Sequence, residues 1–234
     1  MSASTRHLAF FTIGESPRSD VVPEMARFLG QHVRISEYGV LDSLSPAELA
    51  SLAPVPGQHC FATRRRDGSL VELGKQATEE RLAALMSQAD ASAKFDVLVP
   101  LCTGTAIPQL ITLIVEPQQV VDQLVAALSR HTRNIGVILP LASQLDTFHL
   151  DAEITSNIRL AHASPYADDA ANAEMQMREA GRQLAGVDFI VMHCMGYRSW
   201  MRQAVAQAAQ CPVLLSNQMV AQTLAQLLEP SSSA

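Results

Sequence analysis

The stretch Asp96-Val-Leu-Val-Pro-Leu-Cys-Thr-Gly-Thr105 decides the fold, because a short buried run leads directly to a cysteine. Val97, Leu98 and Val99 form an apolar run that is typical of a strand covered on both faces of a parallel sheet. The segment Val187-Asp-Phe-Ile-Val-Met-His-Cys-Met-Gly196 repeats the pattern of an aspartate, a buried run and a cysteine. Ligands of open α/β folds bind beyond the carboxyl ends of parallel strands. We therefore expect Cys102 and Cys194 to face each other there.

The composition is that of a globular protein. The chain has 234 residues, of which 48% are hydrophobic and 17% charged, enough for one large domain or two lobes. The net charge of −6 gives no reason to expect a nucleic-acid partner. No apolar run approaches the ~18 residues that span a bilayer, and the run at 8–13 is too short for a signal peptide. We expect a cytoplasmic protein with no membrane segment, whose four cysteines are thiols.

Expected strands and helices alternate along the chain, which predicts an α/β fold with parallel sheets. Strands are expected at 8–13, 33–38, 97–99, 134–141, 158–163, 189–192 and 212–218. Helices are expected from 21 or 23, at 44–50, 75–91, 106–110, 120–131 and 168–184, from 197, and at 220–228. A hairpin is expected at 61–73, because Asp67-Gly68 is a strong turn signal.

Two similar lobes follow from this pattern, with parallel sheets flanked by helices and an active-site cleft between the lobes. The N-terminal lobe is expected at 1–117, with the C-terminal helix at 218–229 as a candidate to pack back on it. The C-terminal lobe is expected at 118–217, and 230–234 is expected to be a disordered tail. The alanine-rich helices leave room for a homodimer face.

The loop after the first expected strand is a candidate anion site. It carries Ser16 and Arg18 before a helix, and such loops point backbone N–H groups at one spot. The alternative is that Ser16 and Asp20 only cap the helix and that Arg18 is solvated. In the hairpin, strand alternation sends Arg64 and Arg66 to one side and Arg65 to the other, so Thr63 and Arg64 are weaker candidates for the site.

Two thiolates on opposite sides of a carbon acid would allow stereoinversion. One thiolate removes the proton next to a carboxylate, and the opposite thiol returns a proton to the other face. Segments that could begin helices follow Cys102 and Cys194, and a helix N-terminus favours a thiolate. Backbone N–H groups with Thr103, Thr105 and Ser16 are candidate donors to the enolate oxygens, and Arg18 would hold a carboxylate.

Other interpretations of the cysteines stay open. All four could be buried apolar side chains, and we interpret Cys60 and Cys211 in that way. A zinc site of Cys102, Cys194 and His193 is disfavoured, because neighbouring residues of an extended segment point apart and no ligand-spacing motif is present. The loop that begins at Gly14 lacks the further glycines of a phosphate-binding loop. We expect no metal and no cofactor.

Several segments together resemble the AroM family over nearly the whole chain. They are Thr12-Ile-Gly-Glu-Ser-Pro-Arg-Ser-Asp-Val, Thr63-Arg-Arg-Arg-Asp-Gly-Ser, Cys194-Met-Gly-Tyr and Pro212-Val-Leu-Leu-Ser-Asn. That family is similar in turn to the aspartate, glutamate and hydantoin racemase superfamily, whose members have two α/β lobes with a catalytic cysteine from each. Cys102 and Cys194 stand where those cysteines would. The resemblance implies that Ser16, Arg18, Thr103 and Asn217 are cleft residues.

One departure concerns the second cysteine. Glutamate racemases follow it with Thr-His, whereas Met195 and Gly196 stand here, so acid/base help from that histidine is missing. The presence of both thiols favours a two-base reaction over a decarboxylation that uses one. The complete set of expected substrate-binding residues is Ser16, Arg18, Thr63, Arg64, Thr103, Gly104, Thr105, Gly196, Tyr197 and Asn217.

The sequence thus predicts a cofactor-independent racemase, epimerase or related isomerase that acts on a small carboxylate or cyclic amide. Two alternatives remain: a non-catalytic protein that binds or senses a small anion in the same cleft, and a decarboxylase or lyase that uses one thiol.

Overall fold

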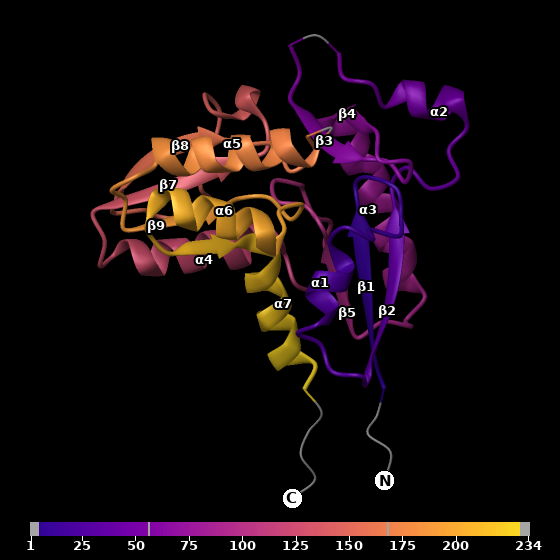
Figure 1. The fold of residues 1–234 in the computed structure, drawn as a ribbon. Helices are drawn as coiled ribbons and strands as arrows, with labels where there is room; N and C mark the ends of the chain where they lie inside the picture. The colour runs from indigo at the N-terminus through magenta and orange to yellow at the C-terminus, as the bar shows by residue number, and fades with distance from the viewer. Residues whose placement is uncertain (1–4, 56, 168, 230–234) are drawn as a thin grey trace, which may run out of the picture. The chain divides into compact units, whose positions relative to one another are not determined.

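The computed structural model of the protein describes residues 5–55, 57–167 and 169–229 (Figure 1). The chain divides into two compact units. Unit 1 comprises Met1–Pro117 with Ala221–Ala234, and unit 2 comprises Gln118–Val220. The expected tail at 230–234 and the expected helix start at Asp168 lie outside the described residues.

Unit 1 contains a parallel sheet and a separate hairpin. Its elements are β1 Arg6–Thr12, α1 Val22–Ala26, β2 Val33–Gly39, α2 Pro46–Ser51, β3 Cys60–Arg64, β4 Leu70–Gly74, α3 Lys75–Ala91, β5 Val97–Pro100 and β6 Leu113–Ile114. The sheet has the strand order β2-β1-β5-β6, and all its pairs are parallel. Strands β3 and β4 pair antiparallel, and Gly68 in their turn has φ +89°, a conformation that favours glycine.

Unit 2 contains a second parallel sheet. Its elements are α4 Pro117–Ser129, β7 Asn134–Leu139, the short 3₁₀ helix η1 Ala142–Gln144, β8 Asn157–His162, α5 Ala170–Gln183, β9 Phe189–Met192, α6 Ser199–Ala209, β10 Val213–Leu215 and α7 Ser216–Leu227. Helix α7 begins in unit 2 and ends in unit 1. The strand order is β10-β9-β7-β8, again with parallel pairs.

The two sheets repeat one topology. If the four strands of each sheet are numbered in the order in which they occur in the chain, both sheets have the spatial order 2-1-3-4. The aspartates of the two sequence segments also have the same role. Asp96 accepts a hydrogen bond from His7 N at 2.7 Å, and Asp188 accepts from Asn134 N at 2.8 Å. Asp96 therefore connects the start of β5 to the start of β1, and Asp188 connects the start of β9 to the start of β7.

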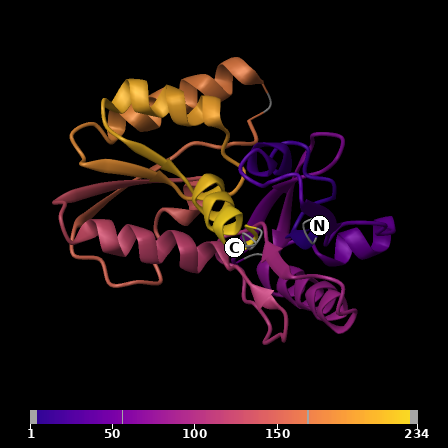
Figure 2. The same cartoon turned by 90° about the horizontal axis from the view of Figure 1, so that it is seen from below.

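The central strands β5 and β9 are buried on both faces, as their apolar runs predict, whereas the edge strands β2 and β8 keep exposed residues. In unit 2, helices α5 and α6 cover one face and α4 covers the other (Figure 2). Met177 and Val205 belong to the core of the first face, and Val121 and Val125 to that of the second. In unit 1, α3 packs on one face of the sheet through Leu82, Met86 and Ala89 (Figure 1).

The predicted α/β fold with parallel sheets flanked by helices is confirmed, and most expected elements lie within a few residues of their observed bounds. The helix expected at 106–110 is wrong. Pro108 disfavours helical backbone before it, and nearby backbone N–H groups bind carboxylates of α3 instead: Ala106 N donates to Glu79 at 2.8 Å and Thr112 N to Asp90 at 2.8 Å. Within the described residues, no helix has the length and apolar character needed to cross a bilayer.

Candidate functional site

The strand order gives each sheet one candidate position for a ligand. Where the first and third strands of such a sheet lie side by side, their connections leave in opposite directions, and the crevice beyond their carboxyl ends binds ligands. In unit 1 these strands are β1 and β5, and in unit 2 they are β7 and β9. Cys102 is the second residue after β5, and Cys194 is the second residue after β9. The two cysteines therefore hold equivalent positions in the two units.

The loop after β1 is held by Asp42. The carboxylate of Asp42 accepts from Ser16 N at 2.8 Å, from the Ser16 hydroxyl at 2.6 Å and from Gly39 N at 2.7 Å. Because a serine hydroxyl has a single hydrogen, this contact leaves only the lone pairs of Ser16 Oγ to meet a ligand. The expectation that Ser16 donates to an enolate oxygen is therefore corrected. Ser16 presents a hydrogen-bond acceptor.

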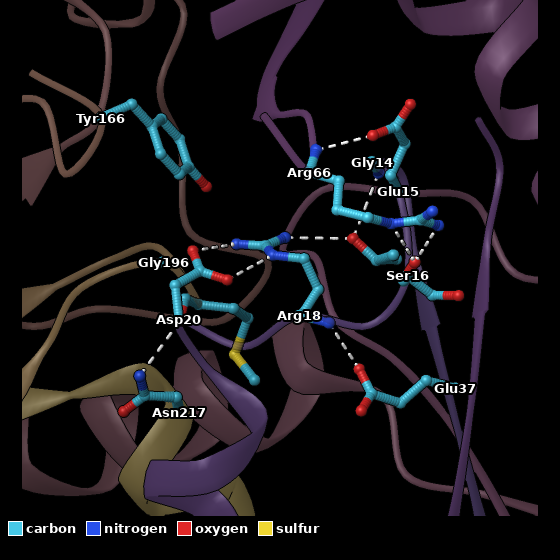
Figure 3. A network of polar contacts seen from close by, with 12 residues as sticks. Gly14, Glu15, Ser16, Arg18, Asp20, Glu37, Arg66, Tyr166, Gly196 and Asn217 are labelled. Carbon is cyan, nitrogen blue, oxygen red and sulfur yellow. Dashed lines mark hydrogen bonds and ion pairs between the residues drawn. The ribbon is translucent and has the colours of Figure 1, made fainter. Parts of the chain in front are cut away.

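Arg18 is buried in the same loop, with 4% of its surface exposed. Its Nε donates to Asp20 Oδ1 at 2.8 Å, its Nη2 to Asp20 Oδ2 at 2.9 Å, and its Nη1 to Thr12 Oγ1 at 3.0 Å (Figure 3). The alternative in which Arg18 is solvated and Asp20 caps the helix is wrong, because the N-cap of α1 is Val21. One edge of the guanidinium, the edge that would bind a carboxylate in bidentate fashion, is thus engaged by Asp20.

Glu37 supports this loop from β2. Its carboxylate accepts from Arg18 N at 2.6 Å. Burial raises the pKa of Glu37, and the hydrogen bond from Arg18 N–H acts against that rise. The loop is therefore tied to strand β2 by a carboxyl group whose charge is costly.

The arginines of the hairpin contact the loop in a way that the sequence did not predict. Strand β3 ends at Arg64, so Arg65 and Arg66 belong to the turn and strand alternation does not apply to them. Arg65 Nη2 lies 3.3 Å from Glu15 Oε1, and Arg66 Nε donates to Ser16 O at 3.1 Å (Figure 3). Arg65 and Arg66 therefore hold the loop.

Thr63 is fully buried beneath the loop, and its hydroxyl has no hydrogen-bond partner. A Cβ on Gly14 would lie 2.5 Å from Thr63 Oγ1 and 2.8 Å from Arg64 O. The hairpin therefore approaches the loop so closely that only glycine fits at position 14, and Thr63 and Arg64 act here as packing neighbours of the loop.

Cys102 lies in an irregular segment. Its Sγ donates to Thr103 O at 3.3 Å, and the sulfur is half-buried. Gly104 follows with φ +90°, a conformation that favours glycine, and Thr105 is buried. Because the expected helix is absent, no helix N-terminus favours the thiolate of Cys102. The expectation that Thr103, Gly104 and Thr105 bind substrate stays a prediction.

Cys194 has a different environment. Gly196 N donates to its Sγ at 3.4 Å, and the phenol oxygen of Tyr166 lies 3.9 Å from the same sulfur. A Cβ on Gly196 would lie 2.5 Å from that oxygen, so the Tyr166 ring requires glycine at position 196. The turn after β9 thus brings a backbone donor to the second thiol, and the segment after β8 brings a hydroxyl.

Tyr197 and Asn217 brace this turn. Tyr197 is fully buried, and its hydroxyl donates to Ala163 O at 2.8 Å. Burial raises the pKa of Tyr197 well above its ordinary value, and the neighbouring Cys194 and Tyr166 add to the rise. Asn217 Nδ2 donates to Met195 O at 3.1 Å (Figure 3). It also donates to Tyr197 O at 2.6 Å. Both side chains position the turn through its backbone.

His193, Cys60 and Cys211 have surroundings of other kinds. His193 Nε2 bonds to the buried Asp122 at 2.9 Å, and Phe148 packs against its ring. The described part of the chain holds no group of three or more His, Cys, Asp or Glu side chains that could bind a metal. Burial raises the pKa of Cys211, and burial with the nearby Glu72 raises that of Cys60, which makes both thiols less reactive.

Sequence reasoning missed Asp42, Glu15 and Tyr166. Asp42 follows a strand by three residues, and its role depends on Gly39, where a Cβ would lie 2.7 Å from Ser16 N. Tyr166 follows β8 in a Ser164-Pro165-Tyr166 segment at the carboxyl end of the sheet. A polar residue at such a strand end is a signal that could have suggested it.

Comparison with protein families gives one match: the family model described as AroM protein matches residues 8–228. No curated protein matches the sequence.

Solved structures with related folds cover nearly the whole chain. Glutamate racemase from Thermus thermophilus is 13% identical with a TM-score of 0.63, over 97% of this chain and 82% of that one. Maleate cis-trans isomerase from Nocardia farcinica is 14% identical with a TM-score of 0.53, over 94% and 91%. An arylmalonate decarboxylase is 12% identical with a TM-score of 0.54, over 97% and 94%. At these identities the likeness shows the fold.

Proposed function

This chain belongs to the AroM family, and on that premise we propose that it is a racemase, an epimerase or a related isomerase that needs no cofactor. Its substrate is a small carboxylate or cyclic amide, and Cys102 and Cys194 transfer the proton. The observation that carries the proposal is that both cysteines are the second residue after the third strand of sheets with the same strand order. The names of the racemases and the isomerase that share this fold support the same reaction class.

In the proposed reaction, one cysteine removes a proton from the substrate carbon and the other cysteine donates a proton to the same carbon. A thiolate sulfur takes the proton from Cα, and the electrons of the broken C–H bond pass into an enolate. The S–H of the other cysteine then gives its proton to the opposite face of that carbon, and its sulfur becomes the thiolate. The pair ends with the number of protons it had at the start. The reaction requires both sulfurs to reach one carbon from opposite sides.

The enolate oxygens need hydrogen-bond donors, because a carbon acid of this kind is weak. Backbone N–H groups and the hydroxyls of Thr103 and Thr105 are the proposed donors, since both threonines follow Cys102 directly. Ser16 has another role, because its hydrogen is held by Asp42 at 2.6 Å. The proposed role of Ser16 is to accept from an N–H of the substrate.

This acceptor narrows the substrate class. Amino acids and hydantoins both carry an N–H on the carbon that would lose its proton, whereas simple dicarboxylic acids do not. A ligand oxygen that carries no hydrogen, such as a carboxylate or carbonyl oxygen, would meet the Ser16 lone pairs at the same place and be repelled. The proposed substrates are therefore small 2-amino acids or cyclic amides of the hydantoin type.

Solvent exchange tests the proposal. The protein is incubated in deuterium oxide with single enantiomers of small 2-amino acids and 5-substituted hydantoins, against blanks without protein. Loss of the α-proton signal and inversion of configuration are then measured. We expect both in the wild type and a loss of inversion of about a hundredfold or more in Cys102→Ser and in Cys194→Ser, the size of effect typical of a lost general acid or base. Cys211→Ser is the matched control and should keep the wild-type rate. Full inversion activity in both single variants would contradict the proposal.

A decarboxylase or lyase that uses one thiol is the second candidate. It is favoured by a difference between the two sulfurs, because the Gly196 N–H donates to Cys194 Sγ whereas Cys102 Sγ donates to the Thr103 carbonyl. Carbon dioxide release from small disubstituted malonates, retained in Cys102→Ser and lost in Cys194→Ser, would identify it. A protein that only binds its ligand would show neither solvent exchange nor carbon dioxide release.

A further inference from the structure

Each sulfur contacts a backbone group of its own loop, and these two backbone groups are of opposite kinds. Cys194 Sγ accepts from Gly196 N at 3.4 Å, and an N–H group can only donate. Cys102 Sγ donates to Thr103 O at 3.3 Å, and a carbonyl can only accept. A donor beside sulfur favours the thiolate, whereas an acceptor beside sulfur favours the protonated thiol.

The phenol of Tyr166 adds to this difference. Its oxygen lies 3.9 Å from Cys194 Sγ, within hydrogen-bond distance for sulfur. We propose that Tyr166 is a positioning residue that donates to Cys194, so that Cys194 rests as the thiolate base and Cys102 rests as the thiol acid. This assignment rests on the proposed function, which by itself does not say which thiol starts the reaction.

The ring of Tyr166 is held in place for this role. Only 6% of Tyr166 is exposed, and its backbone N donates to Ser164 Oγ at 3.2 Å. The phenol lies directly on the Cα of Gly196, where a Cβ would be 2.9 Å from Tyr166 Cζ. The hydroxyl and the Gly196 N–H therefore reach the same sulfur from a fixed arrangement, which lowers the cost of orienting them.

The neighbouring titratable groups have other partners. The Tyr197 hydroxyl donates to Ala163 O, and burial keeps its pKa well above the ordinary value, so it stays neutral. His193 precedes Cys194 in the chain, but its Nε2 bonds to Asp122. Tyr166 is a titratable neighbour of Cys194, and its hydroxyl lies close enough to the sulfur to donate a hydrogen bond to a thiolate.

Thiol alkylation of the intact protein tests the assignment without a substrate. Iodoacetamide reacts with thiolates, and mass spectrometry of the peptides gives a separate rate for each cysteine between pH 5 and 10. At pH 7 we expect Cys194 to react before Cys102, and Cys60 and Cys211 to react last. Tyr166→Phe keeps the ring and removes the hydroxyl. It should slow Cys194 at pH 7 about fivefold, move its rate profile to higher pH, and leave Cys102 unchanged.

Tyr38→Phe, a substitution of the same kind in unit 1, is the matched control and should leave every rate unchanged. Melting curves check that each variant folds. If Tyr166→Phe does not fold, Gly196→Ala is the second variant. Its Cβ would displace the phenol and should slow Cys194 in the same direction.

Two results would overturn the inference: Cys102 reacting before Cys194, or a Cys194 profile that Tyr166→Phe does not move. The outcome is separable from that of the proposed function. An unmoved profile together with loss of inversion in Cys194→Ser overturns the role of Tyr166 alone. A moved profile together with full inversion in both cysteine variants overturns the proposed function alone.

Discussion

Units 1 and 2 share their strand order and the position of a cysteine, but they differ in how the loop around that cysteine is built. In unit 1, Cys102 enters an irregular segment, and the structured loop is the one after β1, which Asp42 and the hairpin arginines hold. In unit 2, the turn at Cys194 itself is braced, by Asn217 and Tyr166. Equivalent strands thus deliver equivalent thiols, whereas the loops decide what each thiol and its neighbours can do. The two units therefore repeat the strand order of the sheet, whereas the loops that follow the strands differ and determine the surroundings of each cysteine.

The largest expected effect comes from removing the brace of each unit. Asp42→Ala leaves Ser16 N and Gly39 N without their acceptor, and we expect a loss of about 2–4 kcal/mol in the free energy of unfolding. Asn217→Ala leaves the Met195 and Tyr197 carbonyls without their donor, and we expect a smaller loss of about 1–3 kcal/mol because no charged group is involved. Urea unfolding measures both.

Gln203→Ala, on helix α6, is the control for this pair. No loss of stability in either Asp42→Ala or Asn217→Ala would contradict the view that each unit depends on its own brace, and a larger loss in Asn217→Ala than in Asp42→Ala would contradict the expected order. Because Asp42 also holds the Ser16 hydroxyl, Asp42→Ala should in addition weaken discrimination between a hydantoin and its ring-oxygen analogue.

The next effect concerns the glycine beside each brace. In Gly14→Ala the new Cβ would lie 2.8 Å from the backbone oxygen of Arg64, which cannot move without shifting the hairpin. In Gly196→Ala the nearest atoms belong to the phenol end of the Tyr166 side chain, so the new Cβ would have to displace a side chain but no backbone. We expect Gly14→Ala to cost about 1–3 kcal/mol of stability and Gly196→Ala to cost less. Gly57→Ala is unsuitable as a control because Gly57 has a positive φ. Ala50→Gly in helix α2 is the reference, and we expect it to cost about 1 kcal/mol of stability from helix propensity alone.

A larger loss in Gly196→Ala than in Gly14→Ala would contradict this order. The same two variants separate packing from chemistry. Gly196→Ala should slow the alkylation of Cys194 with little change in melting temperature, whereas Gly14→Ala should lower the melting temperature and leave that alkylation rate unchanged.

The sequence predicted the strands and the cysteines better than it predicted the loops. The runs at Val97 and Phe189 are buried on both faces, and no helical or polar pattern competes with them, so their assignment held. The helix expected after Thr105 failed because Pro108 and two carboxylates of α3 compete for that backbone, and the position of α3 is a tertiary fact. Asp42 and Arg66 reach the Ser16 loop from residues distant in sequence, and local patterns carry no such information. The paired aspartates were visible as a repeat, although their partners were not.

Those aspartates give the smallest expected effect, a change in the pH dependence of stability. Hydrogen bonds from His7 N, and a smaller contribution from Arg6, lower the pKa of Asp96, and hydrogen bonds from Asn134 N and Arg133 N lower that of Asp188. A carboxyl group with a lowered folded pKa stabilises the fold above its unfolded pKa of about 4, and that stabilisation is lost as the pH falls through the folded value. Asp96→Asn and Asp188→Asn should therefore lower stability at pH 7, and the difference from the wild type should shrink towards pH 3.

Glu37 in unit 1 should have the opposite effect on the pH dependence of stability. Because burial raises its pKa, its protonated form favours the fold, and that contribution is present below its ordinary pKa and is lost as the pH rises through the raised value. Glu37→Gln keeps an acceptor for Arg18 N, so it should be at least as stable as the wild type at pH 7 and lose that advantage towards pH 3. Urea unfolding of all three variants at several pH values measures the slopes. If the three differences from the wild type stay constant with pH, the carboxylates act only through packing. If Asp96→Asn and Asp188→Asn differ in slope, the equivalence of the two units stops at the strand order and does not extend to the electrostatics of their strand starts.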